Sequence, residues 1–328
     1  MRPWFGPEEQ AAAAEAIASG WVAQGPRVAA FEQAFAQRIQ TDHAIALSSC
    51  TAALHLALVV LGIRPGDEVV VPSLSFIATA NAARYVGATP VFADVDATTL
   101  NLTAETIEPV LSDRTRAVIV VDQAGTPADV EPIRRLCDPL GVTIVEDAAC
   151  AVGATYRGLP VGAGSPLTAF SFHPRKIITT GEGGMLTTSN PAWASRLRRL
   201  REHGMSVSAL ERHRLGAATI ERYLETGFNY RMTDVQAAIG LVQLGRLETI
   251  VARRRQLASR YHQALSDLPG IRMIHDPPYG TTNYQSFWVA LPDDGPVDRI
   301  ELFQRMADAG VASRRGIMAA HLEPAYQE

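Results

Sequence analysis

Apolar and polar residues alternate along the first half of the chain with two different periods, which predicts strands and helices in turn. Short apolar runs with many valines and isoleucines predict strands at residues 43–47, 69–71, 89–93, 117–121 and 142–145. Helical periodicity predicts helices at residues 7–19, 28–39, 77–85, 104–111 and 130–139. Such alternation with short connections is typical of a mostly parallel sheet with helices on both faces. The pattern therefore predicts an α/β fold of three layers.

The second half of the chain has a different pattern. A helix is expected at residues 191–202, and residues 205–224 have a weak periodicity that suits a surface loop with a short helix. A long helix is expected to begin after Thr233, its N-cap, and to continue toward Leu265. Further short elements predict a smaller α+β domain: strands at residues 272–274, 285–291 and 311–313, and a helix at 298–308. We expect a large domain over residues 1–235 and a C-terminal domain over residues 236–328.

Composition narrows the class of protein. Of the 328 residues, 47% are hydrophobic, which is ordinary for a globular protein with a core. The 30 basic and 34 acidic residues leave a net charge of −4, so the chain has no general attraction for nucleic acid. Its one basic cluster, at residues 196–201, is expected on a solvated helix face.

Cysteines and apolar runs indicate the compartment. Cys50, Cys137 and Cys150 are odd in number and have neither disulfide nor zinc spacing, which points to a reducing compartment. No signal segment is visible, and the richest apolar stretch, residues 51–63, is too short to span a bilayer and contains His55. We therefore expect a cytoplasmic protein with no membrane partner and no metal site.

The candidate chemistry centres on Lys176. A predicted strand ends in Glu146 and Asp147, and acids at the carboxyl end of a buried parallel strand commonly face a ligand. An acid in this place and a later lysine are the pair that pyridoxal phosphate requires. The lysine forms an imine with the cofactor, and the acid keeps the pyridine nitrogen protonated. By itself the pair is a weak signal, because buried acids and strand-end lysines are common.

Motifs around this pair make the interpretation specific. In chain order they are Ser48-Ser49-Cys50-Thr51-Ala52-Ala53-Leu54, Val71-Pro72-Ser73-Leu74-Ser75-Phe76, Glu146-Asp147-Ala148-Ala149, Phe170 to Lys176, Gly227-Phe228-Asn229-Tyr230-Arg231-Met232 and His321-Leu322-Glu323-Pro324-Ala325-Tyr326. With them the chain resembles the DegT/StrS family of pyridoxal-phosphate-dependent sugar aminotransferases from Gly20 to Tyr326. The resemblance implies the aspartate aminotransferase type of fold, fold type I, with a mixed but mostly parallel sheet and a smaller C-terminal domain.

The resemblance also implies a phosphate site. A helix start offers unpaired amides and a positive dipole to an anion, and the helix that opens at Thr51 and Ala52 is where the family binds the cofactor phosphate. Ser171 matches the family's phosphate-binding serine. Asn229 matches an asparagine that reaches across a dimer interface to the partner's phosphate, which implies a homodimer with shared sites. The family usually has glycine in place of Cys50.

Ring contacts are implied in the same way. Phe76 matches an aromatic residue that stacks on the pyridine ring. Asp147 is assigned to the pyridine nitrogen, and Glu146 to a local hydrogen bond. Cys150 stands where the family commonly has glutamine or histidine near the ring hydroxyl, and a thiol is a weaker donor than either. Lys176 is the covalent and proton-carrying residue.

The leading functional hypothesis is an aminotransferase that moves an amino group, with L-glutamate as the donor suggested by the resemblance, to a nucleotide-linked keto sugar. One alternative is a sugar dehydratase of the same fold, although related dehydratases carry histidine at the position of Lys176. Another is a non-catalytic regulatory or binding homologue. Family members usually continue beyond the motif at residues 321–326, so we expect the C-terminal domain to be shortened.

Overall fold

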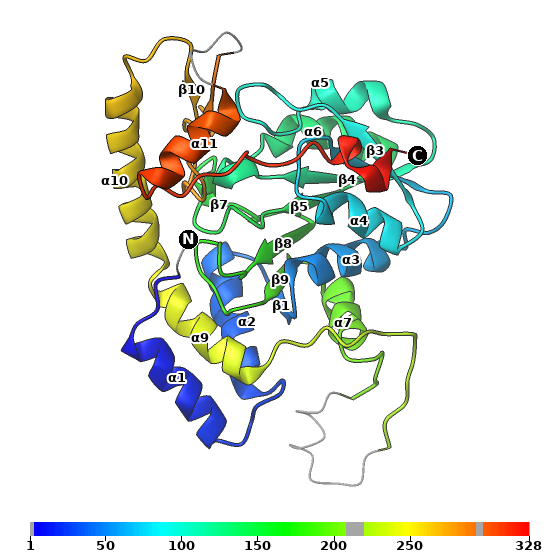
Figure 1. Ribbon diagram of the computed structural model, residues 1–328. Helices are drawn as coiled ribbons and strands as arrows, with labels where there is room; N and C mark the ends of the chain where they lie inside the picture. The colour runs from blue at the N-terminus through cyan, green and yellow to red at the C-terminus, as the bar shows by residue number, and fades with distance from the viewer. Residues whose placement is uncertain (1–2, 208–219, 293–297, 328) are drawn as a thin grey trace.

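A central seven-stranded sheet organises the molecule (Figure 1), whose computed structural model describes residues 3–207, 220–292 and 298–327. The strands follow one another in the order β1-β9-β8-β5-β4-β2-β3. In chain order they are β1 (His43–Leu47), β2 (Glu68–Pro72), β3 (Thr89–Ala93), β4 (Thr115–Val121), β5 (Thr143–Asp147), β8 (Leu167–Ser171) and β9 (Gly184–Thr188). β9 runs antiparallel to both of its neighbours, while the pairs from β8 to β3 are parallel. The predicted mixed, mostly parallel sheet is confirmed.

Helices pack on both faces of this sheet and bury its apolar side chains. One face is covered by α3 (Cys50–Val60), α4 (Ala78–Tyr85) and α7 (Pro191–Leu200). The other is covered by α2 (Pro26–Ile39), α5 (Ala104–Ile107) and α6 (Val130–Cys137). α1 (Pro7–Ala18) and α9 (Asp234–Gly245) extend the layer that contains α2. Alternation of side chains along the buried strands supplies an apolar surface to each layer.

The C-terminal region runs along one side of the sheet and then crosses back over it (Figure 1). Its elements are α10 (Leu247–Leu265), β10 (Arg272–Met273), β11 (Gly280–Thr281), β12 (Val289–Ala290) and α11 (Arg299–Asp308). β11 pairs with β6 (Thr155–Tyr156), which also pairs with β7 (Leu159–Pro160). The last residues contact the loop after β2, where the Ala320 N–H donates to the Ser73 carbonyl at 2.7 Å.

Several predicted elements were wrong in length or kind. The helix expected after Thr233 breaks into α9 and α10 with a bend of 57°. At this break Arg246 donates to Glu8 at 2.5 Å and lies 5.1 Å from the centre of the Trp4 ring. The helices expected at residues 104–111 and 130–139 end early in 3₁₀ turns that contain Pro109 and Pro139, since proline lacks the N–H that would continue an α-helix.

In the C-terminal region the strand expected at residues 285–291 is confined to β12, and residues 311–313 form no strand. Part of the loop and short helix expected at residues 205–224 lies outside the described residues. The basic cluster at 196–201 is not simply solvated. Its last member, Arg201, is 5% exposed and binds Glu32 and the Ala46 carbonyl.

Asp234, the first residue of α9, connects that helix to the start of α2 in the same helical layer. Its side chain is fully buried and accepts hydrogen bonds from the backbone N–H groups of Gly25, Arg27 and Val28 at 2.8, 3.1 and 2.9 Å. These groups are unpaired donors at the start of α2, so Asp234 caps that helix from another part of the chain. The neighbouring Thr233 caps α9 itself, as expected.

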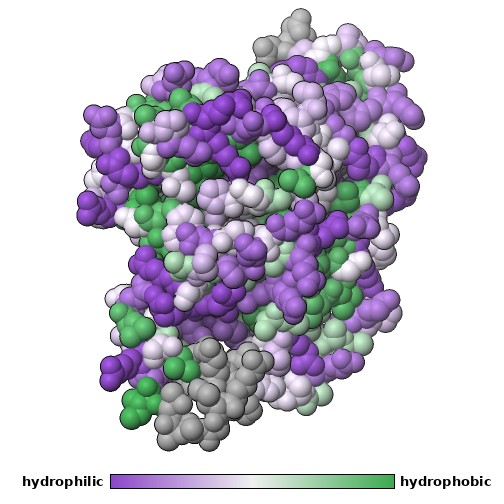
Figure 2. All heavy atoms as spheres, turned by 180° about the vertical axis from the view of Figure 1, so that it is seen from behind, coloured by the Kyte–Doolittle hydropathy of each residue, from purple (hydrophilic) through white to green (hydrophobic). Residues whose placement is uncertain are grey.

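On the face turned away in Figure 1, the hydrophobic side chains of the described residues form separate patches among hydrophilic ones (Figure 2). No single helix of the described chain combines the length and apolar composition needed to cross a membrane. The bent pair α9 and α10 passes that test only when its two helices are taken together.

Candidate active site

Asp147 lies at the carboxyl end of β5 and faces α4. Its Oδ2 accepts a hydrogen bond from Thr79 Oγ1 at 3.1 Å, and its Oδ1 accepts from the Ala149 N–H at 3.2 Å. Because side chains alternate along a strand, Glu146 points to the opposite face, where Thr168 Oγ1 donates to its Oε2 at 3.2 Å. The expectation that Glu146 is satisfied locally is confirmed.

Lys176 lies in the segment that leaves β8, the strand next to β5. Its Nζ donates to Cys150 Sγ at 3.1 Å, so the lysine meets the turn that follows Asp147. Parallel strands bring their carboxyl ends to the same edge of a sheet, which is why residues distant in sequence meet here. In the residues just before Lys176, the Arg175 N–H donates to His173 Nδ1 at 3.2 Å.

Burial and charge set the protonation of this pair. Burial raises the pKa of Asp147 above its ordinary value, although the Ala149 N–H, Lys176 and Thr79 oppose the shift. Burial by itself lowers the pKa of Lys176, but Cys150, Cys50 and Asp147 together outweigh it, and the pKa is raised. Desolvation alone would favour a neutral amine. In the cofactor-free chain these neighbours favour the protonated one instead.

The start of α3 lies against the same edge of the sheet. Ser49 is the N-cap and its Oγ accepts from the Ala52 N–H at 3.1 Å. This leaves the amides of Cys50 and Thr51 as the open donors of the helix start within the described chain. A Cβ at Gly184 would lie 2.4 Å from backbone atoms of Ser49, so only glycine allows β9 this close.

Ser171 is brought to this helix start by the register of the sheet. It is the direct partner of Gly184 in the antiparallel pair of β8 and β9, and Gly184 touches the turn before α3. Ser171 is 7% exposed, and its Oγ accepts a long hydrogen bond of 3.4 Å from the His173 N–H. A hydroxyl and a helix N-terminus therefore converge beside the Lys176 segment.

Two predicted site residues lie at the surface. Phe76 is 52% exposed, and its carbonyl accepts from the N–H of Thr79, the residue that contacts Asp147. Asn229 is exposed and bridges to Glu202 through the backbone. The next residue, Tyr230, accepts from the Ser48 N–H at 2.8 Å, so the Asn229 segment lies beside the turn before α3.

Sequence reasoning missed three contributors to this site. Thr79 contacts Asp147, and Asn283 and Gln285 bond to the segments that carry Cys150 and Lys176. None has a local motif, because each comes from a separate element. The sequence itself contains one further signal for Lys176. It is the only lysine, because the other 29 of the 30 residues counted as Lys or Arg are arginines.

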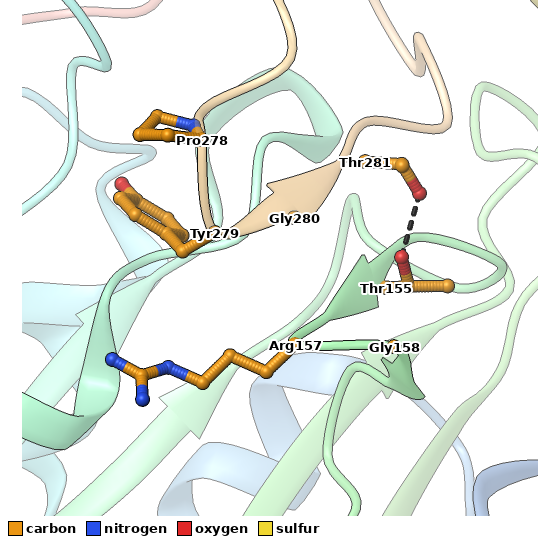
Figure 3. Close-up of a pocket in the computed structure, with 7 residues that line it drawn as sticks. All are labelled: Thr155, Arg157, Gly158, Pro278, Tyr279, Gly280 and Thr281. Carbon is orange, nitrogen blue, oxygen red and sulfur yellow. Dashed lines mark hydrogen bonds between the residues drawn. The ribbon is translucent and has the colours of Figure 1, made fainter.

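A separate groove of about 550 Å³ lies at the small sheet formed by β11, β6 and β7 (Figure 3). The side chains of Arg157 and Tyr279 extend along it, and Thr155 bonds to Thr281 at 2.7 Å. Arg157 is paired with Asp129 and Glu131, so its charge is already compensated. None of the predicted site residues lines this groove.

Comparisons with known proteins place this geometry in context. A family model described as the DegT/DnrJ/EryC1/StrS aminotransferase family matches residues 4–328. The aminotransferase TlmJ from Streptoalloteichus hindustanus is 39% identical, with a TM-score of 0.91 over 99% of this chain and 86% of that chain. DesV from S. venezuelae is 37% identical, with a TM-score of 0.88 over 98% of this chain and 82% of that chain.

A third structure is informative about the cofactor. The putative sugar aminotransferase Spr1654 from Streptococcus pneumoniae in its PMP form is 30% identical, with a TM-score of 0.93 over 99% of this chain and 87% of that chain. The same protein is also known in a PLP form.

Proposed function

Because the chain belongs to the DegT/DnrJ/EryC1/StrS aminotransferase family, and is thus a pyridoxal-phosphate-dependent sugar aminotransferase, we propose that it transfers an amino group from L-glutamate to a nucleotide-linked keto sugar. We assign the chemistry to Lys176 and Asp147. The observation that carries this assignment is that the sole lysine of the chain lies against the turn after a buried strand-end carboxylate. A chain that uses arginine at its 29 other basic positions has a lysine at the one place where a nucleophilic amine is required.

The donor set fits the cofactor. A phosphate dianion suits the open amides at the start of α3 together with the Ser171 hydroxyl, and a protonated pyridine nitrogen suits the Asp147 carboxylate. Ala52 contributes through the helix dipole, because its own N–H is held by Ser49. When bound, pyridoxal phosphate supplies a carbonyl that takes up the amino group and a ring that accepts electrons.

The residues of this chain would divide the work as follows. Nζ of Lys176 would hold the cofactor covalently and, once released by the amino donor, accept the proton from the donor's α carbon. Asp147 would keep the pyridine nitrogen charged. Thr79 and the Ala149 amide orient the Asp147 carboxylate. Phe76 would cover the ring, and the Cys150 thiol would stand near Lys176 and the ring hydroxyl.

We also propose a homodimer in which Asn229 of each subunit completes the phosphate site of the other. The support is the exposed position of Asn229 and the family's pattern at this motif. A division of the chain near residue 235 and a cytoplasmic location remain predictions.

Two measurements test the proposal. The purified protein should take up pyridoxal phosphate with a visible absorbance band that is bleached by L-glutamate. The glutamate-treated protein should then regain the band with at least one member of a panel of nucleotide-linked keto sugars. A protein that never forms the band would be a binding homologue, and one that is bleached by glutamate but regains the band with no sugar would act on another class of acceptor.

A further inference from the structure

A loop of the C-terminal region is buried against the sheet beside Lys176. This 282–286 loop carries Asn283 and Gln285, which are 0 and 5% exposed. Arg254 fixes the loop from α10, because its Nη1 donates to the carbonyls of Tyr284 and Gln285 at 3.0 Å each. The loop belongs to neither β5 nor β8, yet its side chains reach the segments that follow both strands.

Asn283 holds the turn that follows Asp147. Its Nδ2 donates to the carbonyls of Cys150 and Val152 at 2.8 Å each, and its Oδ1 accepts from the Gln285 N–H at 2.8 Å. Both amide hydrogens and the acceptor are therefore used, which gives the side chain a single orientation. Its contact with Cys150 is through the backbone of the same residue whose thiol meets Lys176.

The approach of Asn283 is close enough to require a glycine opposite it. A Cβ at Gly125 would lie 1.8 Å from Asn283 Oδ1, and Gly125 has φ of +91°. The Asn283 N–H donates to the Gly125 carbonyl at 3.3 Å, and the Ser286 N–H donates to the Ala124 carbonyl at 3.2 Å. The loop is thus fixed on both its side-chain and its backbone side.

Gln285 holds the segment of Lys176. Its Nε2 donates to the Arg175 carbonyl at 2.6 Å, and this carbonyl belongs to the peptide group that contains the Lys176 nitrogen. Asn283 and Gln285 are joined by their own hydrogen bond. One short loop therefore ties the backbone beside Lys176 to the backbone after Asp147.

We propose that Asn283 and Gln285 are positioning residues that set where Lys176 Nζ stands relative to Asp147. The inference rests on the proposed roles of Lys176 and Asp147. A lysine side chain is flexible, so the direction of its amine depends on the peptide from which it starts. A displacement of about 1 Å at a reacting group can cost about 10²-fold in rate.

The first test uses the cofactor-free protein and Gln285→Ala, with Asn283→Ala as a second variant. Because Lys176 is the only lysine in the sequence, acylation by an amine-selective reagent followed by peptide mapping reports this one side chain, apart from the chain's α-amine. Electrostatic interactions with Cys150, Cys50 and Asp147, together with the hydrogen bond to Cys150, hold its pKa above the ordinary value. We expect the pH midpoint of acylation to fall toward that of an ordinary lysine in both variants.

Thr188→Ala is the matched control. Thr188 is 0% exposed, and its Oγ1 donates to the Pro166 carbonyl at 2.7 Å and accepts from the Asn190 N–H at 3.1 Å. It therefore pins backbone as Asn283 does, but at the end of β9 opposite Gly184. We expect this variant to melt at a lower temperature with an unchanged acylation midpoint.

The second test uses the loaded protein. Pyridoxamine phosphate has no carbonyl and binds without a covalent link to Lys176. Its affinity therefore reports the rest of the cofactor site independently of where Lys176 lies. In Gln285→Ala we expect the affinity for pyridoxal phosphate to fall about tenfold or more, while the affinity for pyridoxamine phosphate is retained. A loss of about tenfold is the size expected when about one hydrogen bond is removed. The pH midpoint of the visible band should shift with it.

The outcomes separate the two proposals. If Gln285→Ala and Asn283→Ala melt lower but keep the parent's acylation midpoint and its ratio of the two affinities, the clamp is only structural and the inference is wrong. If the parent never forms the visible band, the proposed function fails, and the acylation midpoint alone still decides whether the loop positions Lys176.

Discussion

The two halves of the candidate site are built differently. Asp147 is buried and held by partners within its own chain, and Lys176 is fixed through Cys150. Asn229 is exposed, and Phe76 is about half exposed. The comparison teaches that contacts within one chain fix the charge and orientation of Asp147 and Lys176. The outer half of the site, Phe76 and Asn229, is exposed and is not held in this way. We expect the first half to fail on substitution in any assembly state and the second to depend on a partner.

The largest effect is expected from Lys176→Ala, which should abolish the visible band and transamination while the fold is retained. Lys176→Arg is the matched control, because it keeps the positive charge beside Asp147 but has no nucleophilic amine. Both variants should be inactive, with the arginine variant melting closer to the parent. Borohydride reduction of the loaded parent should fix a label in the peptide that contains Lys176. A label fixed equally well in Lys176→Ala would show that another amine is used.

Asp147→Asn should lower the rate by about 10²- to 10³-fold, because an amide cannot hold the pyridine nitrogen protonated by charge. Glu146→Gln removes a carboxylate on the opposite face of β5 and should stay within a few-fold of the parent. Rate constants for both half-reactions provide the measurement. Nearly equal losses of rate in the two variants would mean that a buried carboxylate at this strand end matters, whichever face of the sheet it points to.

Mixing tests the outer half of the site. Lys176→Ala and Asn229→Asp should each be inactive, the second because a carboxylate repels the phosphate. In a shared-site heterodimer one site collects both defects and the other has neither, so random exchange should restore about a quarter of the sites. Should mass measurement confirm exchange while no activity returns, Asn229 must act within its own subunit.

A smaller effect is expected for Phe76→Ala, since a stacked ring contributes only part of the cofactor's binding. Cofactor affinity should fall about 2- to 12-fold, which corresponds to the usual worth of an aromatic pair. Phe76→Tyr keeps the ring and should bind like the parent. Equal affinity in the alanine variant would place the ring of Phe76 away from the cofactor.

The smallest effect concerns stability without the cofactor. Burial raises the pKa of Asp147, so the carboxyl stabilises the fold fully below its ordinary pKa and loses that contribution as the pH rises through the folded value. At pH 7 cofactor-free Asp147→Asn should therefore melt slightly above the parent, and the difference should shrink toward pH 4. Melting curves across this range provide the check, and a variant that melts lower at pH 7 would contradict the sign.

Local pattern predicted much of the fold and little of its tertiary detail. β1 and β3 have the predicted bounds, because each is a short apolar run with turn residues at its ends. The two-residue strands β6 and β11 have no such signature, since they pair across more than a hundred positions. At the break between α9 and α10, Arg246 contacts Trp4 and Glu8 from the start of the chain, and no local pattern indicates these contacts.

The site divides in the same way. Lys176 and Asp147 could be selected from motifs that lie within short stretches, and the uniqueness of the lysine would have strengthened the choice. Thr79, Asn283 and Gln285 could not, because their roles arise only when three separate segments meet at one edge of the sheet. A residue that contacts the cofactor can be recognised from a local motif, whereas the residues that hold it in place cannot.

The cap that Asp234 places on α2 has a consequence for synthesis of the protein. The N–H groups it satisfies lie 206 to 209 positions earlier, so the start of α2 has to wait for them until residue 234 has left the ribosome. At about 5–20 residues per second this delay is about 10–40 s. We therefore expect α2 to gain resistance to protease only in nascent chains arrested beyond residue 234. Resistance in shorter arrested chains would show that α2 is stable without its distant cap.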